Sequence, residues 1–260
     1  MTDFASLIAQ FRQELRSNSR IELSFDDFEM HPGKLELPWL NSMNRYLGDE
    51  LGGTFPLPAD DQQLLALPRR LDIAWGTREG DQLVGGQVEY MVGCLNLRAL
   101  STAFSEPTYR NLKRYTPREL ELTPEFRIAT LFDCGSAANT TNHLTYLLYD
   151  EATRAYHGLA LEYGSQLLRL PLSIGDYVRT ALRWYGAWGW QFLYLSLDDF
   201  ETRVDGSTRL GVYKLCEVLP ELFPQADWSI IAEKQAYFDI ARPHALNYRE
   251  QQQRRSHRPA

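Results

Sequence analysis

The stretch LTYLLYDEATRAYHGLALEYGSQLLRLPLSIGDYVRTALRWYG, residues 144–186, decides the fold class. Its first two thirds hold three runs rich in aromatic and aliphatic residues, and a turn at 151–153 separates the first two. Runs of this length and composition are typical of β-strands joined by short turns. The sequence therefore predicts a hairpin over 144–163, which a third strand over 166–172 extends into a meander.

A helix follows the meander within the same stretch. Ser173 stands three residues before Asp176, which is a capping-box pattern at a helix start. Apolar residues then recur on one face at Tyr177, Val178, Ala181, Leu182 and Tyr185. Gly186 is a natural C-cap, because glycine adopts the left-handed backbone conformation without strain. We expect the helix to end there.

The flanking segments predict further strands and helices. An amphipathic helix is expected over 3–17, and a short one over 60–67. The segment 188–197 fits either a helix or a strand. C-terminal helices are expected from 209 to near Pro220 and over 227–239, the latter started by Asp227 or Ser229. Strands are expected over 21–25 (or an extended arm), 71–77, 87–93 and 126–133, and loops over 48–58, 105–125 and 133–142. Strands and helices that follow one another in blocks favour the α+β class.

The charge balance disfavours general nucleic-acid binding. The chain has 27 Lys and Arg against 34 Asp and Glu, a net charge of −7, whereas phosphate binding needs a positive field. Residues 242–260 hold five arginines against Glu250, a charge of +4, so residues 1–241 carry −11. An acidic body attracts a basic partner and speeds its arrival. The end of the tail, QQQRRSHRPA, has no apolar periodicity, and we expect 242–260 to be disordered.

Cysteine use and hydropathy favour a cytoplasmic protein. Cys94, Cys134 and Cys216 are odd in number and far apart, which fits a reducing compartment better than a disulfide framework. Charged residues interrupt the first apolar run, so we expect no signal peptide. The longest near-apolar stretch, Tyr185–Leu197, is too short to span a bilayer. We expect no membrane contact.

The familiar catalytic and cofactor motifs are missing from the sequence, which contains no GxSxG, Walker A, GxGxxG or HExxH pattern. The nearest His–Cys pair is Cys134 and His143, and we expect no metal and no cofactor. The strongest enzyme hypothesis uses the same thiol. Cys134 would be the nucleophile of a hydrolase or transferase, with His143 or His157 as the base. Asp133 or Asp150 would orient that base.

Two local features favour protein binding instead. The densest acidic cluster comprises Asp198, Asp199, Glu201 and Asp205, and it is the expected docking site for a basic partner. Aromatic residues crowd the preceding stretch, where Trp188 and Trp190 are candidate contacts, because tryptophan dominates interface hot spots. Only Arg183 lies close to them in the sequence, which disfavours the stacking of nucleic-acid bases.

Residues 144–186 resemble the SMI1/KNR4 (SUKH) superfamily. The matching pattern is a strand, a hairpin with Tyr149, Asp150 and Thr153, a second strand, and a helix entry at Ser173, Tyr177 and Val178. LPELFPQADWS (219–229) resembles segments near the end of some members, so the core of the resemblance covers 126–229. The family's N-terminal Trp and Leu-Pro signature is blurred, with Trp39 or Leu65–Pro68 in its place.

The resemblance implies a single domain over 1–241 with a mixed, mainly antiparallel sheet flanked by helices. It also implies a non-catalytic function. Many bacterial members of the family are immunity proteins that block polymorphic toxins, often nucleases, whereas fungal members are regulatory interaction proteins. The expected partner is therefore a cognate toxin, for instance a basic nuclease domain. The alternatives are the thiol-dependent enzyme and a regulatory scaffold tethered by the basic tail.

Overall fold

A computed structural model describes residues 4–29, 70–78, 82–83, 87–88, 90–98, 126–133, 144–150, 155–164 and 166–256. A seven-stranded sheet runs in the order β1-β2-β5-β6-β7-β8-β9, and every pairing in it is antiparallel. A separate hairpin, β3 with β4, lies between β2 and β5 in the chain. The strands are β1 (Ile21–Glu29), β2 (Arg70–Thr77), β3 (Gln82–Leu83), β4 (Gln87–Val88), β5 (Val92–Arg98), β6 (Phe126–Asp133), β7 (Thr145–Asp150), β8 (Ala155–Tyr163) and β9 (Gln166–Leu170).

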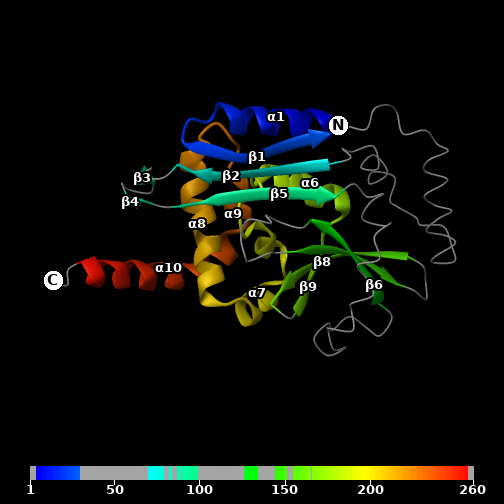
Figure 1. Ribbon diagram of the computed structural model, residues 1–260. Helices are drawn as coiled ribbons and strands as arrows, with labels where there is room; N and C mark the ends of the chain where they lie inside the picture. Colours follow the sequence, from blue (N-terminus) through cyan, green and yellow to red (C-terminus); the bar gives the residue numbers. More distant parts are fainter. Residues whose placement is uncertain are drawn as a thin grey trace.

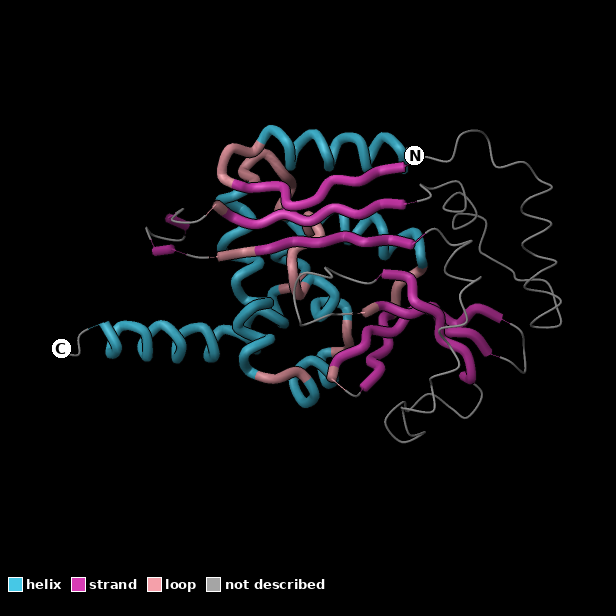
Figure 2. The backbone as a smooth tube through the Cα atoms, in the orientation of Figure 1, coloured by secondary structure: helices cyan, strands magenta, loops and turns pink. Residues whose placement is uncertain are grey.

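The sheet has two halves joined at one point. A single register pair, Leu97 with Asp133, links β5 to β6, whereas the neighbouring strand pairs are registered along most of their lengths. Figure 2 shows the consequence: β1, β2 and β5 run side by side, and the strands from β6 to β9 are tilted against them. Side-chain interactions must therefore supply much of the connection between the halves.

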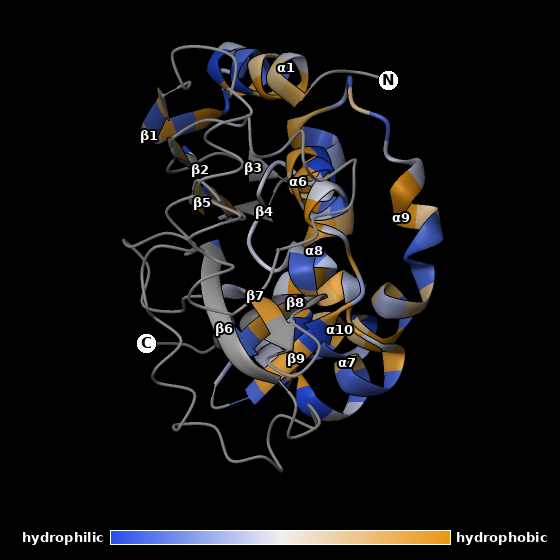
Figure 3. Cartoon of the chain, turned by 90° about the vertical axis from the view of Figure 1, so that its right-hand side faces the viewer, coloured by the Kyte–Doolittle hydropathy of each residue, from blue (hydrophilic) through white to orange (hydrophobic). Residues whose placement is uncertain are grey.

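The helices cover one side of the sheet and its β1 edge. Helices α6, α8 and α9 lie on one side of the strands (Figure 3), and α1 lies beside β1 (Figure 1). The predicted α+β class is confirmed. The helices are α1 (Phe4–Ser17), α6 (Ile174–Arg183), the 3₁₀ helix η3 (Trp190–Tyr194), α7 (Leu197–Arg203), α8 (Gly206–Leu222), α9 (Ser229–Glu233) and α10 (Gln235–Ser256).

The core forms where the strands' alternating residues meet the helices' apolar faces. Leu71, Ile73 and Trp75 alternate along β2 and are all buried. Trp75 requires a glycine opposite, because a Cβ on Gly93 would lie 2.2 Å from the indole nitrogen. The apolar stripe predicted for 177–185 is buried as expected. One cluster of buried side chains extends from Phe4 to Ala241 and so includes α1, the strands and α10.

Several local predictions are confirmed. The helix predicted over 3–17 is α1, and the meander is β7, β8 and β9. Ser173 caps α6 as predicted, since its hydroxyl accepts the backbone N–H of Asp176 at 3.0 Å. The predicted cap at Asp227 or Ser229 is not confirmed, because the residue at the N-cap of α9 is Trp228, which makes no side-chain capping bond; Asp227 accepts the N–H of Ser229 at 2.9 Å. The predicted helix over 60–67 and the predicted loops over 48–58, 105–125 and most of 133–142 lie outside the described residues.

Other predictions are corrected. The segment 188–197 is largely the 3₁₀ helix η3, helix α8 continues past Pro220 to Leu222, and the segment 227–239 is divided between α9 and α10. The tail predicted as disordered from Arg242 is helical through Ser256. Burial of Phe238, Ala241 and Ala245 anchors the first half of α10, and Arg249 pairs with Glu217 of α8. Beyond that anchor, α10 points away from the rest of the molecule (Figure 1).

Candidate functional site

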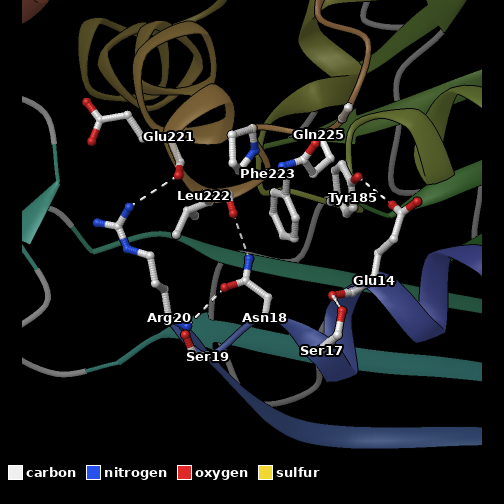
Figure 4. A pocket seen from close by; sticks show the side chains of 12 residues that line it. Glu14, Ser17, Asn18, Ser19, Arg20, Tyr185, Glu221, Leu222, Phe223 and Gln225 are labelled. Atoms are coloured by element: carbon white, nitrogen blue, oxygen red, sulfur yellow. Dashed lines mark hydrogen bonds between the residues drawn. The ribbon is translucent and has the colours of Figure 1, made fainter.

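A pocket of about 450 Å³ lies where the turn after α1 meets the end of α8. Three parts of the chain line it: the end of α1 with residues 17–20, Tyr185 after α6, and residues 221–226. Figure 4 shows the rings of Tyr185 and Phe223 together on one wall, with Glu14 and Arg20 approaching from the α1 side. Concave sites lined by aromatic rings and a few polar groups are the usual places for ligands and inserted side chains.

Tyr185 has an uncommon backbone conformation for its size. Its φ is 55°, and it is the only residue other than glycine with a positive φ in the described part of the chain. Helix α6 ends in a Schellman motif, because Tyr185 N–H donates to Leu182 O at 3.1 Å and Gly186 N–H donates to Ala181 O at 2.8 Å. The residue in the left-handed position of this motif is usually glycine, and here it is tyrosine. The sequence predicts Gly186 as the C-cap, whereas in the structure the left-handed position lies one residue earlier, at Tyr185.

The surrounding structure holds Tyr185 in this conformation. Trp75 Nε1 donates to Tyr185 O at 2.7 Å, and Cys94 N–H donates to Gly186 O at 2.8 Å. The Tyr185 ring stacks on Phe223 with centroids 3.7 Å apart and planes 7° from parallel. Left-handed backbone in a bulky residue costs about 1–3 kcal/mol and is concentrated at functional sites. The strain places an aromatic ring and its hydroxyl in the pocket wall.

Glu14 presents a carboxylate to the pocket. The Tyr185 hydroxyl donates to Glu14 Oε2 at 2.6 Å, and Gln10 Nε2 donates to Oε1 at 2.8 Å. Both donors are neutral. The nearby arginines of α1, Arg12 and Arg16, are bound to Asp26 of β1 instead. Within the described residues, therefore, this half-buried carboxylate has no cationic partner.

The opposite wall is the C-terminal end of α8. Asn18 Nδ2 donates to Leu222 O at 2.7 Å, and Arg20 Nη1 donates to Glu221 O at 3.2 Å. Unpaired carbonyl groups give a helix C-terminus a partial negative charge, which favours cations there. The turn after α1 thus supplies an amide and a guanidinium that complement this end of the helix.

The Tyr185 hydroxyl is a hydrogen-bond donor over the whole physiological range. Burial, the hydrogen bond to Glu14 and the negative charge of that carboxylate raise the pKa of Tyr185 well above its ordinary value. The pocket accordingly combines a neutral donor, stacked rings, a carboxylate and a negative helix end. Its described lining carries Glu14 and Glu221 against Arg20, and it includes no cysteine or histidine. This arrangement suits the binding of a cationic group.

A second polar cluster is buried and serves the fold. The Tyr177 hydroxyl donates to Asp133 Oδ2 at 2.8 Å and lies 2.9 Å from Thr145 Oγ1, and Asn96 N–H donates to Asp133 Oδ1 at 3.3 Å. Burial and the negative charge of Asp133 raise the pKa of Tyr177 well above its ordinary value. Asp133, Thr145 and Tyr177 are at most 1% exposed. The cluster ties the weak β5–β6 junction to α6.

The acidic residues predicted to dock a partner form two helix starts. Ser196 caps α7, and its hydroxyl also donates to Asp199 Oδ2 at 2.7 Å, while Asp199 pairs with Arg203. Asp198 and Glu201 are exposed on α7. Asp205 caps α8 by accepting the N–H groups of Ser207 and Thr208. The structure thus places three of the carboxylates on α7 and the fourth at the start of α8, and Asp199 and Asp205 take part in capping.

Asp205 is held in its charged form. Partial burial acts to raise its pKa, but hydrogen bonds from Ser207, the Tyr163 hydroxyl and the backbone of Thr208 outweigh this and lower the pKa of Asp205 well below its usual range. Of the two predicted tryptophan contacts, Trp190 has no exposed surface, so no partner can reach it here. Trp188 is half-buried, and its ring occupies the place that a Cβ on Gly211 would need.

Only part of the thiol hypothesis falls within the described residues. Cys134 and His143 lie outside the described residues, as does the side chain of His157 in β8. Asp133 pairs with Thr145, whereas Asp150 pairs with Phe126, so the two candidate orienters lie at opposite ends of the β6–β7 pair. At about 3.3 Å per residue, roughly 20 Å separates them. Burial raises the pKa of the Cys216 thiol to about 12, so little of this thiol is thiolate near neutral pH.

The pocket residues had only a faint signal in the sequence. The run RSNSR (16–20) has the composition of a turn, and a turn there is what places Asn18 and Arg20 against α8. Nothing local marks Glu14 or Phe223, because their neighbours in the pocket come from distant parts of the chain. Tyr185 fits the apolar stripe of a helix, and its left-handed conformation is invisible in that pattern.

The described residues hold neither a metal-binding cluster nor a membrane-spanning helix. No group of three or more His, Cys, Asp or Glu in this part of the chain is placed to hold a metal ion. Among the same residues, none of the helices combines the length and the apolar character that crossing a bilayer requires. In comparisons with known proteins, the chain matches no family model, no curated protein and no solved structure.

Proposed function

We propose that this chain is a non-catalytic module that binds a basic protein partner in the cytoplasm, and that the pocket between α1 and α8 is part of the binding surface. One observation carries the proposal. Glu14 is a half-buried carboxylate in a pocket wall, and no cation among the described residues neutralises it. A charge in that position is better satisfied in a complex that supplies the opposite charge.

The charge of the whole chain supports the same partner class. The net charge is −7, and Asp198, Asp199, Glu201 and Asp205 add a local acidic field around the starts of α7 and α8. Such a field raises the association rate with a basic protein and weakens as salt is added. We assign the α7–α8 acidic residues to steering the partner, and the pocket to holding it.

The resemblance of residues 144–186 to the SMI1/KNR4 superfamily supplies the biological class. We propose that the chain is an immunity protein of that superfamily, and that its partner is a cognate toxin whose active surface it occludes. A basic nuclease domain has the required charge. In the scaffold alternative, the basic tail is the tether; its residue Arg249 is already paired with Glu217 within the chain.

Affinity capture from the native host, read by mass spectrometry, tests this function. The proposal predicts one protein of basic isoelectric point, retained in about equimolar amount and released by salt. Capture of no stoichiometric partner, together with turnover of a substrate at enzyme-like rates by the purified chain, would contradict it and favour the Cys134 hypothesis.

A further inference from the structure

We propose that the pocket between α1 and α8 is a receptor for the guanidinium group of a single arginine side chain of the partner. The inference rests on the proposed function and names the chemical group that the site recognises. It follows from three observations: the volume of the pocket, the absence of a cationic partner for Glu14 among the described residues, and the two aromatic rings beside it.

The pocket selects a cation. Among the described residues, the Glu14 carboxylate accepts only the neutral Tyr185 hydroxyl and Gln10 amide, and each of its oxygens can accept a further hydrogen bond. The C-terminal end of α8 adds partial negative charge from the opposite side. An anionic ligand would be repelled by both the Glu14 carboxylate and the end of α8. The single guanidinium among the described lining residues is that of Arg20, and it already donates to Glu221 O.

The pocket also prefers a planar cation. Tyr185 and Phe223 form a parallel stack, and Figure 4 shows both rings in the pocket wall next to Glu14. A guanidinium can stack on an aromatic ring while its edge donates two parallel hydrogen bonds to a carboxylate, which an ammonium group cannot do. The guanidinium of Arg20 already donates to a carbonyl oxygen at the same end of α8, so this end of the helix can hold a guanidinium.

The pocket is large enough to take an arginine side chain. A volume of about 450 Å³ is within the range of small-ligand sites and exceeds what one arginine side chain fills. The strained backbone at Tyr185 holds the ring and the hydroxyl in place before the partner arrives, so that little conformational entropy is lost on binding.

The test is a titration of the whole chain, followed by amide NMR, with N-acetyl-arginine methylamide as the probe. Shifts are expected at residues 14, 17–20, 185 and 221–226, with millimolar affinity. The neutral isostere N-acetyl-citrulline methylamide should cause no saturable shift, and the lysine analogue should bind at least about threefold more weakly. Equal binding of either analogue, or no shift in the pocket with the arginine probe, would overturn the inference.

A matched pair of variants locates the recognition. Glu14→Gln keeps an acceptor for the Tyr185 hydroxyl but removes the charge, so arginine-probe affinity should fall about tenfold or more. Glu250→Gln removes a charge from the exposed side of α10, away from the pocket, and should leave affinity unchanged. Equal effects of the two variants would contradict a specific site. Since the probe needs no partner, its failure alongside normal partner capture would refute this inference only, and normal probe binding without a captured partner would refute only the proposed function.

Discussion

At the scale of single residues, two tyrosines that lie eight positions apart have different tasks. Tyr177 has no exposed surface and joins Asp133 and Thr145 to α6. Tyr185 lies at the pocket, with its ring on Phe223 and its hydroxyl on Glu14. Both hydroxyls donate to a carboxylate, but one bond is sealed in the core and the other faces a cavity. We therefore expect Tyr177 to contribute to stability and propose that Tyr185 contributes to binding.

Tyr177→Phe tests the structural role. Removing the hydroxyl deprives Asp133 and Thr145 of one buried hydrogen-bond partner each, which should lower the free energy of unfolding by about 1–3 kcal/mol. Urea denaturation measures the change. The control is Tyr248→Phe on exposed α10, whose loss should stay within about 0.5 kcal/mol. A loss as small in Tyr177→Phe would show that the cluster does not hold the sheet halves together.

Cys216 should be a slow thiol. Burial, with the negative charge of Glu217, raises its pKa to about 12, so near neutral pH very little thiolate is present to react. Iodoacetamide at about pH 8 should alkylate Cys216 at least about a hundredfold more slowly than glutathione. Peptide mass spectrometry follows each cysteine, and Cys216→Ser identifies the peptide. Rapid labelling of Cys216 would contradict its burial, whereas rapid labelling of Cys134 would support the enzyme hypothesis.

At the scale of elements, acidic side chains stabilise the starts of helices α7 and α8. Asp205 accepts two backbone N–H groups at the start of α8 and also accepts the Tyr163 hydroxyl of β8, so one carboxylate takes part both in the cap and in the contact between strand and helix. Helix α8 matters beyond its own length, because its other end forms a wall of the pocket. Loss of the N-cap is therefore expected to destabilise the whole helix, including the end that forms the pocket wall.

Asp205→Ala should lower the free energy of unfolding by about 0.5–2 kcal/mol, the range for losing an N-cap. Asp205→Asn keeps a capping oxygen and should lose less at neutral pH. Because the folded-state pKa of Asp205 is depressed, its charge contributes stability above about pH 3.8, and the contribution is lost as the pH falls below that value. The difference between wild type and Asp205→Asn should therefore shrink in acid. Denaturation at several pH values measures it, and a pH-independent difference would refute the charge effect.

At the scale of the whole molecule, the raised pKa values of the tyrosines predict that the protein loses stability at alkaline pH. Burial raises the pKa of Tyr163, Tyr177, Tyr185, Tyr194 and Tyr237 above the ordinary value of 10.0. The unfolded chain releases these protons near pH 10, whereas the folded chain retains them to higher pH. Their contribution is therefore complete below about pH 10 and is lost as the pH rises through the folded-state values.

Urea midpoints between about pH 8 and about pH 11 should fall steadily above about pH 10, and tyrosinate absorbance should appear together with unfolding. Tyr177→Phe should reduce the steepness of that fall, since it removes one of the titrating groups. Ionisation of all the tyrosines near pH 10 without unfolding would show that the rings are more exposed than the structure has them.

The sequence predicts those parts of the molecule that depend on neighbouring residues. The meander over 144–170 and the cap at Ser173 follow from local patterns, and both are confirmed. The pocket could not be predicted, because the Tyr185–Glu14 bond joins residues 171 positions apart. The continuation of α10 past Arg242 depends likewise on Arg249 meeting Glu217 on another helix. Chain distance, more than residue type, separates what was predicted from what was missed.

Titration calorimetry of the captured partner against wild type and Glu14→Arg tests the central claim most directly, namely that the pocket receives a basic group of a protein partner. Removing one member of a buried charge pair costs about 2–5 kcal/mol, so affinity should fall at least about thirtyfold. Unfolding measurements on the variant confirm that it is folded. Affinity that changes by less than about threefold, with the variant folded, would contradict the account and place the interface elsewhere.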